Sequence, residues 1–132
     1  MGLVHEAREE LDAHRPGEAL KGVERALLGC LLLDSRLIHV AQLAKLRGDH
    51  FSVEAHRVIY GAMLKRYLEK KRFDLPLIVS DLERDGLLVR AGGAAYAAMC
   101  LDNLDVEMVE DYIAVLQEAA LERKLAAQRA AR

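Results

Sequence analysis

The sequence contains no tryptophan and no threonine, and aromatic residues make up only 5% of its 132 residues. Strands favour aromatic and β-branched residues, so this shortage argues against a β-sheet. Only two prolines occur, at positions 16 and 76, and little therefore interrupts a helical period between them. The composition is 52% hydrophobic, with many Ala and Leu, and it suits packed helices in one domain.

A charge excess of one sign is also missing. The 19 Lys and Arg nearly balance the 21 Asp and Glu, giving a net charge of −2. We therefore expect no direct nucleic-acid binding. No segment approaches 18 uncharged apolar residues, and the N-terminus alternates charge where a signal peptide would be apolar. These features predict a cytoplasmic protein without membrane contact, in which Cys30 and Cys100 are reduced core thiols.

The motifs of catalysis are absent as well. No Gly-Lys dipeptide occurs, so the sequence has no phosphate-binding P-loop, and it has no G-x-G-x-x-G turn. His5 and Glu6 begin an H-E-x-x-H zinc pattern, but Glu9 stands where the second His is required. No serine lies in G-x-S-x-G. We expect no catalytic residue, cofactor or metal in this chain, and an enzyme with an unrecognised active site is disfavoured.

Hydrophobic spacing predicts an all-α fold: a compact orthogonal bundle of about six helices with a long protruding C-terminal helix. The expected organisation is a tail or short helix in residues 1–15, a globular domain in 16–104, and the long helix in 105–132. Residues 19–33 are apolar nearly all round, which indicates a central or interface helix. Gly29 in its middle suggests that a neighbouring backbone lies close.

Polar residues at predicted helix starts are candidate caps. Ser35, Ser52, Asp74 and Asp105 are assigned to the third, fourth, fifth and last helices. The third helix is expected to hold Leu37, Ile38, Val40, Ala41 and Leu43 and to stop at Gly48. The fourth helix, about 53–71, has the inner face Val53, His56, Ile59, Tyr60, Met63, Leu64 and Tyr67. The pair Gly92 and Gly93 predicts a sharp turn into a short helix that contains Tyr96.

The apolar stripe of the last helix extends past the domain that could cover it. We therefore expect its distal end to pack on another helix or another subunit, and the candidate partner interface is Tyr96, Val109, Ile113, Leu116, Leu121 and Leu125. Tyr96 has two interpretations, a core residue or an anchor that faces a partner.

His56 and two charged runs also have alternative interpretations. His56 is expected to be a partly buried packing residue, with a pH-sensing or ligand role as the alternative. The basic run 65–72 and the acidic segment 102–111 are interpreted as solvated helix ends. The alternative is that a basic patch meets an acidic one across a symmetric interface.

A series of landmarks runs through residues 16–125: a Pro, a Glu, an apolar Leu-Gly segment with an Asp, F-x-x-x-x-H-x-x-I-Y, an Asp that opens a Leu-periodic helix, G-G-x-x-Y, and a long helix with a late Arg. The residues are Pro16, Glu24, Leu28, Gly29, Asp34, Phe51, His56, Ile59, Tyr60, Asp74, Ile78, Leu82, Gly92, Gly93, Tyr96, Tyr112 and Arg123. Their order and spacing resemble the amino-terminal domain of DnaB-type replicative DNA helicases.

The resemblance implies a non-catalytic collar domain that self-associates as dimers within a hexameric ring and docks primase, with a helicase loader as a further partner. ATP and Mg²⁺ would belong to a separate motor domain, which the sequence to Arg132 does not contain. The chain is then a fragment of a helicase or a stand-alone relative. The competing interpretation is a free-standing adaptor that mimics the collar to bind helicase or primase.

Overall fold

A computed structural model of the chain describes residues 17–131. Over this range the fold is helical throughout, with no strand, which confirms the predicted all-α class. The elements in chain order are α2 (Glu18–Leu33), η1 (Ser35–Leu37), α3 (Ile38–Leu43), η2 (Gly48–His50), α4 (Glu54–Leu68), α5 (Leu75–Arg84), α6 (Ala94–Met99), η3 (Val106–Met108) and α7 (Val109–Ala130), where η marks a 3₁₀ turn. The tail or short helix expected in residues 1–15 and the zinc-like pattern at His5 lie outside the described residues.

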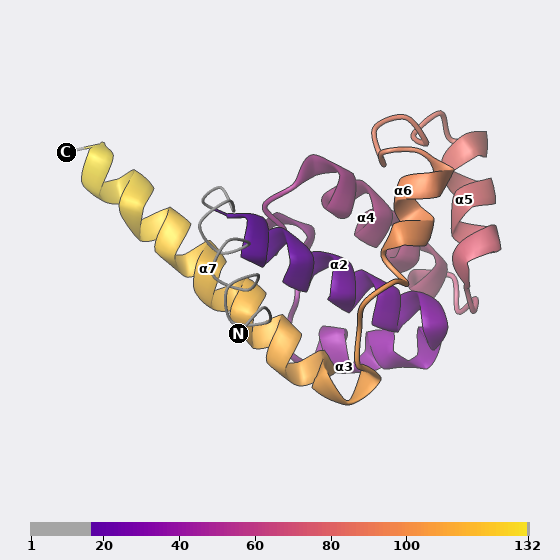
Figure 1. The fold of residues 1–132 in the computed structure, drawn as a ribbon, viewed down its shortest axis with the longest axis horizontal. Helices are drawn as coiled ribbons and strands as arrows, with labels where there is room; N and C mark the ends of the chain where they lie inside the picture. The colour runs from indigo at the N-terminus through magenta and orange to yellow at the C-terminus, as the bar shows by residue number, and fades with distance from the viewer. Residues whose placement is uncertain (1–16, 132) are drawn as a thin grey trace, which may run out of the picture.

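Helix α2 is the central element of the bundle, as its all-round apolar character predicts. Every residue from Ala26 to Leu32 is buried. Figure 1 shows α2 crossing the middle of the domain, with α7 along one side and α4 along the other. Gly29 permits a close approach, because a Cβ built there would lie 2.0 Å from the backbone oxygen of Cys100. The predicted neighbouring backbone is therefore the segment that follows α6.

Helix α4 packs its inner face into the same core. His56, Ile59, Tyr60 and Met63 are buried, and their spacing of three and four residues places them along one stripe. Phe51 lies just before the helix, 1% exposed, and its ring packs edge-on against His56 with centroids 6.5 Å apart. This contact fixes the direction in which the chain enters α4.

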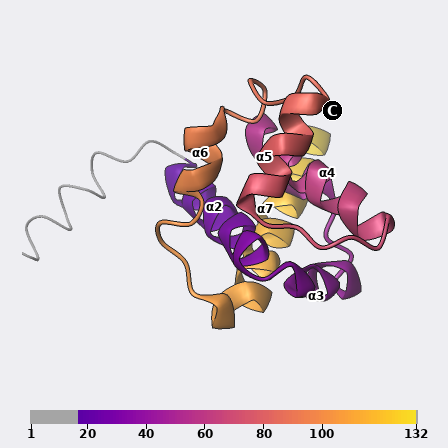
Figure 2. The same cartoon turned by 90° about the vertical axis from the view of Figure 1, so that its right-hand side faces the viewer.

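The turn before α6 has the geometry that its two glycines predict. Gly92 and Gly93 have φ values of 91° and 90°, in the left-handed region that side chains disfavour. The ring of Tyr96 lies directly over Gly92, where an added Cβ would meet it at 2.8 Å. After α6 the chain passes alongside α2 to reach η3 and α7 (Figures 1 and 2).

Two of the four predicted caps are corrected by the structure. Asp34, and not Ser35, caps the turn that precedes α3, since its carboxylate accepts a hydrogen bond from the Arg36 amide at 3.1 Å. Helix α4 begins after Val53 without a side-chain cap, because the Ser52 hydroxyl donates instead to Glu24. Asp74 caps α5 as predicted, and Asp105 caps η3, one turn before α7 begins.

The third helix is shorter than expected, because it ends before the predicted stop at Gly48. Helix α3 ends at Leu43 and buries only Ile38 and Ala41. Leu43 lies about 200° around the helix from Ala41, so its side chain points away from the core and is 85% exposed.

Among the helices that the structure describes, none alone is long and apolar enough to cross a membrane. Helix α2 and the segment Ser35–Leu43 reach that length and composition only as a pair bent by 118°.

Candidate partner-binding surface and the buried network behind it

The first half of α7 belongs to the core of the domain. Val109, Ile113 and Leu116 are 3%, 2% and 0% exposed, and they pack against the buried cluster around α2. Their assignment to a partner interface is therefore wrong, because α2 already covers them. The core expected within residues 16–104 also draws on side chains beyond residue 104.

Leu121 and Leu125 lie on a different face of α7. At about 100° per residue they are some 40° apart, but Leu121 is roughly 140° from the buried Leu116. Both are exposed, Leu121 by 56% and Leu125 by 43%. The single stripe that spacing suggested is thus two faces, one in the core and one in solvent. Of the six predicted interface residues, these two keep an exposed apolar surface.

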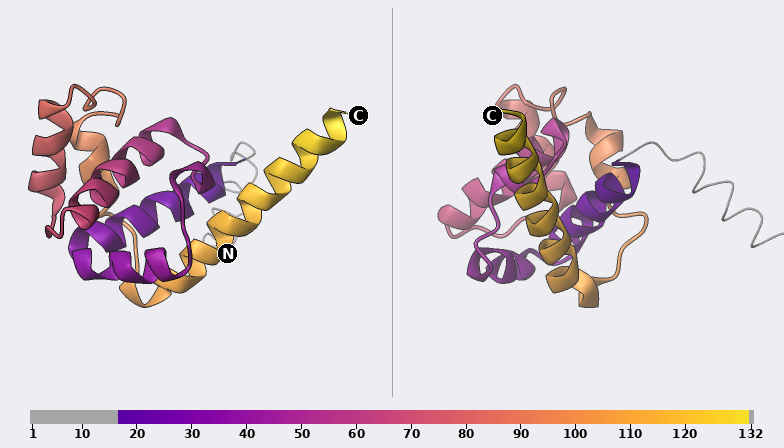
Figure 3. Two further views of the ribbon diagram at one scale, coloured as in Figure 1. Left: turned by 180° about the vertical axis from the view of Figure 1, so that it is seen from behind. Right: turned by 90° about the vertical axis from the view of Figure 1, so that its left-hand side faces the viewer.

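Polar contacts hold the middle of α7 against the domain and leave its end free. The Gln117 side chain donates to the backbone oxygen of Ala44 at 2.7 Å. One turn and a half later, Arg123 donates to the backbone oxygens of Asp49 and His50 at 3.3 and 3.2 Å. Beyond Arg123 the helix continues to Ala130 away from the other helices, as Figures 1 and 3 show.

Tyr96 is not part of that surface. Helix α6, which carries it, lies at the opposite end of the molecule from the tip of α7 (Figures 1 and 3). The Tyr96 hydroxyl lies 2.7 Å from Nε2 of His56, and the two rings stack with centroids 5.8 Å apart. The structure thus separates Tyr96 from Leu121 and Leu125 and places its hydroxyl inside the domain.

His56 belongs to a buried polar network that joins three helices. Its Nδ1 lies 2.7 Å from Oε1 of Glu24, and both side chains are fully buried. The other oxygen of Glu24 accepts from the amide and the hydroxyl of Ser52, at 2.9 and 2.6 Å. A carboxylate only accepts, so Nδ1 carries the proton that it shares with Glu24. His56 is therefore a hydrogen-bonded centre between α2, α4 and α6 and not merely a packing residue.

The network sets the ionisation of Glu24. Burial acts to raise the pKa of this carboxyl, but the hydrogen bonds from His56 and Ser52 outweigh it and lower the pKa below its usual range. Glu24 is thus a carboxylate at neutral pH, and it is hydrogen-bonded to a His56 side chain that is itself fully buried.

Tyr96→Phe is expected to lower the free energy of unfolding by about 1 to 2 kcal/mol, because it leaves Nε2 of the buried His56 without a partner. Chemical denaturation at pH 7 measures the change. Tyr112→Phe is the matched control: the Tyr112 hydroxyl accepts one exposed hydrogen bond from the Asp105 amide, so its removal should cost less than about 0.5 kcal/mol. Equal effects of the two substitutions would contradict the structural role of the Tyr96 hydroxyl.

Glu24 is a functional residue that its own position in the sequence does not identify, since it is only one landmark of the family resemblance. The sequence nevertheless carries a usable signal for it. Glu24 lies in a helix whose own residues are apolar nearly all round, and His56 lies on the inner face of another helix. Two ionisable residues at buried positions need hydrogen-bond partners, so the sequence favours a contact between Glu24 and His56.

The two thiols are core residues, as predicted. Cys30 and Cys100 are buried, and burial raises the pKa of each to about 11. Both are then thiols and not thiolates at neutral pH, which makes them weak nucleophiles. Within residues 17–131, no group of three or more His, Cys, Asp and Glu side chains is placed to hold a metal ion.

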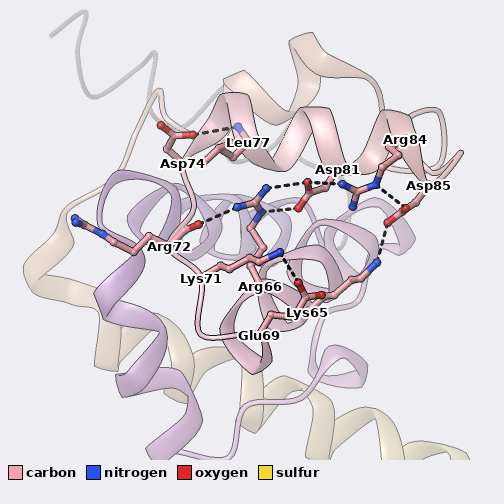
Figure 4. A network of polar contacts seen from close by, with 10 residues as sticks. All are labelled: Lys65, Arg66, Glu69, Lys71, Arg72, Asp74, Leu77, Asp81, Arg84 and Asp85. Carbon is pink, nitrogen blue, oxygen red and sulfur yellow. Dashed lines mark hydrogen bonds and ion pairs between the residues drawn. The ribbon is translucent and has the colours of Figure 1, made fainter.

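Part of the basic run 65–72 ties α4 to α5. Arg66 donates to both carboxylate oxygens of Asp81 and to the backbone oxygen of Arg72. Figure 4 shows its guanidinium between the two helices, with Lys65 reaching Asp85 beside it. The hydrogen bonds from Arg66 lower the pKa of Asp81. Lys65 and Arg66 therefore serve packing within the domain, while residues 70–72 lie outside these pairs with α5.

Comparisons with known proteins match this fold over most of the chain. The family model described as DnaB-like helicase N terminal domain matches residues 18–118. The replicative DNA helicase DnaB of Mycobacterium leprae (strain TN) is 33% identical over 103 residues, covering 77% of this chain and 17% of the relative. The probable replicative DNA helicase of Trieres chinensis is 30% identical over 103 residues, covering 77% of this chain and 22% of the relative.

A solved structure agrees with these relatives. The crystal structure of the N-terminal domain of DnaB helicase from Mycobacterium tuberculosis is 31% identical, with a TM-score of 0.75, covering 80% of this chain and 76% of that one. The chain spans about a fifth of the length of the curated relatives it matches.

Proposed function

Because the chain belongs to the DnaB-like helicase N-terminal domain family, we propose that it is the non-catalytic collar domain of a replicative DNA helicase, mediating oligomerisation and primase docking. ATP and Mg²⁺ would be bound by a separate motor domain of the parent protein, which would act in the cytoplasm. A helicase loader is a further candidate partner.

The observation that carries the oligomerisation role is the apolar face of Leu121 and Leu125 on the free end of α7. Together the two side chains expose about as much area as one whole leucine. Covering that area with another helix is worth roughly 1.5 to 3 kcal/mol. Such a gain falls short of the cost of bringing two proteins together, so this contact alone would be weak and needs others beside it.

We predict that the protein self-associates and that Leu121→Glu weakens the association at least tenfold, which is about 1.4 kcal/mol. The reason is that a carboxylate on this face cannot enter an apolar contact without losing its hydration. Light scattering or sedimentation over a range of concentrations measures the association. The matched control is Ala126→Glu, which adds the same charge to an exposed position about 140° around α7 from Leu121.

A wild-type protein that stays monomeric at high concentration would contradict the role of this face, as would equal effects of the two glutamates. Primase docking needs a separate test. The carboxy-terminal domain of a cognate primase should bind the wild type in calorimetry, and absence of binding would remove primase docking from the proposal.

A further inference from the structure

A basic groove lies between residues 35–39 and residues 67–72, on the side of the domain away from Leu121. It encloses about 510 Å³. Apolar and aromatic side chains form part of it: Leu68 is 76% exposed, and the rings of His39 and Tyr67 meet edge to face with centroids 5.2 Å apart. Cations surround these side chains, so the groove suits a ligand that is both acidic and apolar.

Within residues 17–131, two of the cations have no carboxylate at ion-pair distance. Arg36 pairs with Asp34, and Lys71 pairs with Glu69. Lys70 and Arg72 form no ion pair with any other side chain that the structure describes. In Figure 4 the guanidinium of Arg72 points away from the ion pairs that join α4 and α5. Two positive charges of the groove are therefore available to a binding partner.

The acidic segment, residues 102–111, has the complementary chemistry. Its five carboxylates are Asp102, Asp105, Glu107, Glu110 and Asp111, and none of them forms an ion pair with a described side chain. Between them, on η3, Val106 and Met108 are 43% and 40% exposed. The acidic segment thus presents two apolar side chains surrounded by negative charge.

We propose that the acidic segment of a second copy of this chain binds in the basic groove. Val106 and Met108 would cover the exposed Leu68, while Glu107 and Glu110 would approach Lys70 and Arg72. Opposite charges at such a contact speed association and fix its register, and the apolar side chains supply burial. The inference rests on the proposed oligomerisation role and adds a second contact, distinct from α7.

The positions of the two surfaces allow the contact to form twice. The groove is lined by η1, the start of α3 and the end of α4, and the acidic segment leads into the base of α7; Figure 1 shows α3 and the base of α7 on the same lower side of the domain. A two-fold axis passing between them would pair each groove with the other copy's acidic segment. These two groove contacts would add binding free energy to the weak contact expected from α7 alone.

A nucleic acid is the less suitable occupant. Phosphates would pair with Lys70 and Arg72, but they would leave Leu68 in water. The chain as a whole carries a net charge of −2, with the opposite charges separated onto two surfaces of the same molecule. That separation is the pattern expected when the complementary surface belongs to another copy.

The test is a charge swap between two copies. A groove variant, Lys70→Glu with Arg72→Glu, and an acidic-segment variant, Glu107→Lys with Glu110→Lys, should each self-associate at least tenfold more weakly than wild type, because like charges then meet. Mixed together, the two variants should associate to within about threefold of wild type at low salt, since every groove again meets the opposite charge. Sedimentation of separately labelled proteins measures this, and raising the salt should weaken it.

A mixture that associates no better than either variant alone would overturn the proposal, as would variants that associate like wild type. If the groove variant instead lost binding to single-stranded DNA or to an acidic peptide while its self-association stayed unchanged, the groove would belong to that other ligand. Circular dichroism of each variant guards against a loss of folding.

The design also separates this inference from the proposed function. If Leu121→Glu abolishes association and the charge variants do not change it, the groove contact is wrong and the role of α7 stands. If the charge swap restores association while Leu121→Glu has no effect, the groove contact stands and the α7 face is wrong.

Discussion

Replacing Glu24 by Ala is expected to lower the free energy of unfolding by about 3 to 5 kcal/mol, because it removes the acceptor of several hydrogen bonds around a buried side chain. The carboxylate is the acceptor for three hydrogen bonds, from His56 and from the amide and hydroxyl of Ser52. Without it, His56 is left fully buried with an unpaired Nδ1, and water does not reach the site to replace the lost partner.

Denaturation followed by circular dichroism at pH 7 measures the loss. Glu18→Ala is the matched control on the same helix: Glu18 makes a partly exposed pair with Lys21 at 3.2 Å, and its removal should cost about 0.5 kcal/mol or less. A loss below about 1 kcal/mol for Glu24→Ala would mean that the network does not hold α2, α4 and α6 together.

The contribution of Glu24 to stability has an expected pH dependence. The pKa of Glu24 is lowered in the folded state, so its ionised form stabilises the protein above the usual glutamate pKa of about 4.3. This contribution is lost as the pH falls through the lower pKa of the folded state. The stability difference between wild type and Glu24→Gln should therefore be constant from neutral pH down to about pH 5 and should shrink below about pH 4.

The sequence predicted most of the helices because each carries a local signal. Asp74, next to Pro76 and a period of apolar residues, identifies the start of α5, and Gly92 with Gly93 identifies the turn before α6. Ser35 and Ser52 were assigned as caps for the same kind of local reason. That assignment failed because tertiary contacts decide which acceptor a hydroxyl meets, and the nearest one for Ser52 is on α2, 28 residues earlier in the chain.

The candidate surface was predicted less well, for a related reason. Periodicity identifies apolar positions on α7 but does not say which of them another part of the same chain covers. Ile113 and Leu121 both match a helical stripe, yet α2 covers the first and leaves the second exposed. The pairing of Glu24 with His56 is also nonlocal, because it joins residues 32 positions apart. Such pairs become visible only when the helices are placed in space.

The second large effect is expected at Gly29, where Gly29→Ala should lower the free energy of unfolding by about 3 kcal/mol. The added Cβ would lie 2.0 Å from the backbone oxygen of Cys100 and 2.4 Å from Cδ2 of Leu104. A backbone atom cannot move aside as a side chain can, so the whole segment from Cys100 to Leu104 would have to shift. That cost exceeds the gain of up to about 1 kcal/mol that Ala brings to a helix interior.

Gly61→Ala is the control with the opposite sign. Gly61 lies within α4, is exposed, and has no atom within 4 Å of its added Cβ apart from its chain neighbours and the nearby backbone of α4, so Ala there should stabilise the protein by about 0.5 to 1 kcal/mol. Thermal denaturation of both variants measures the contrast. Similar values for the two substitutions would contradict the close approach at Gly29.

The segment from Cys100 to Leu104, which packs against Gly29, leads directly to Asp105 and so to the start of α7. The backbone oxygen of Asp105 lies 3.5 Å from the Cys30 thiol. Gly29→Ala should therefore also displace the base of α7 and weaken self-association, whereas Gly61→Ala should leave it unchanged.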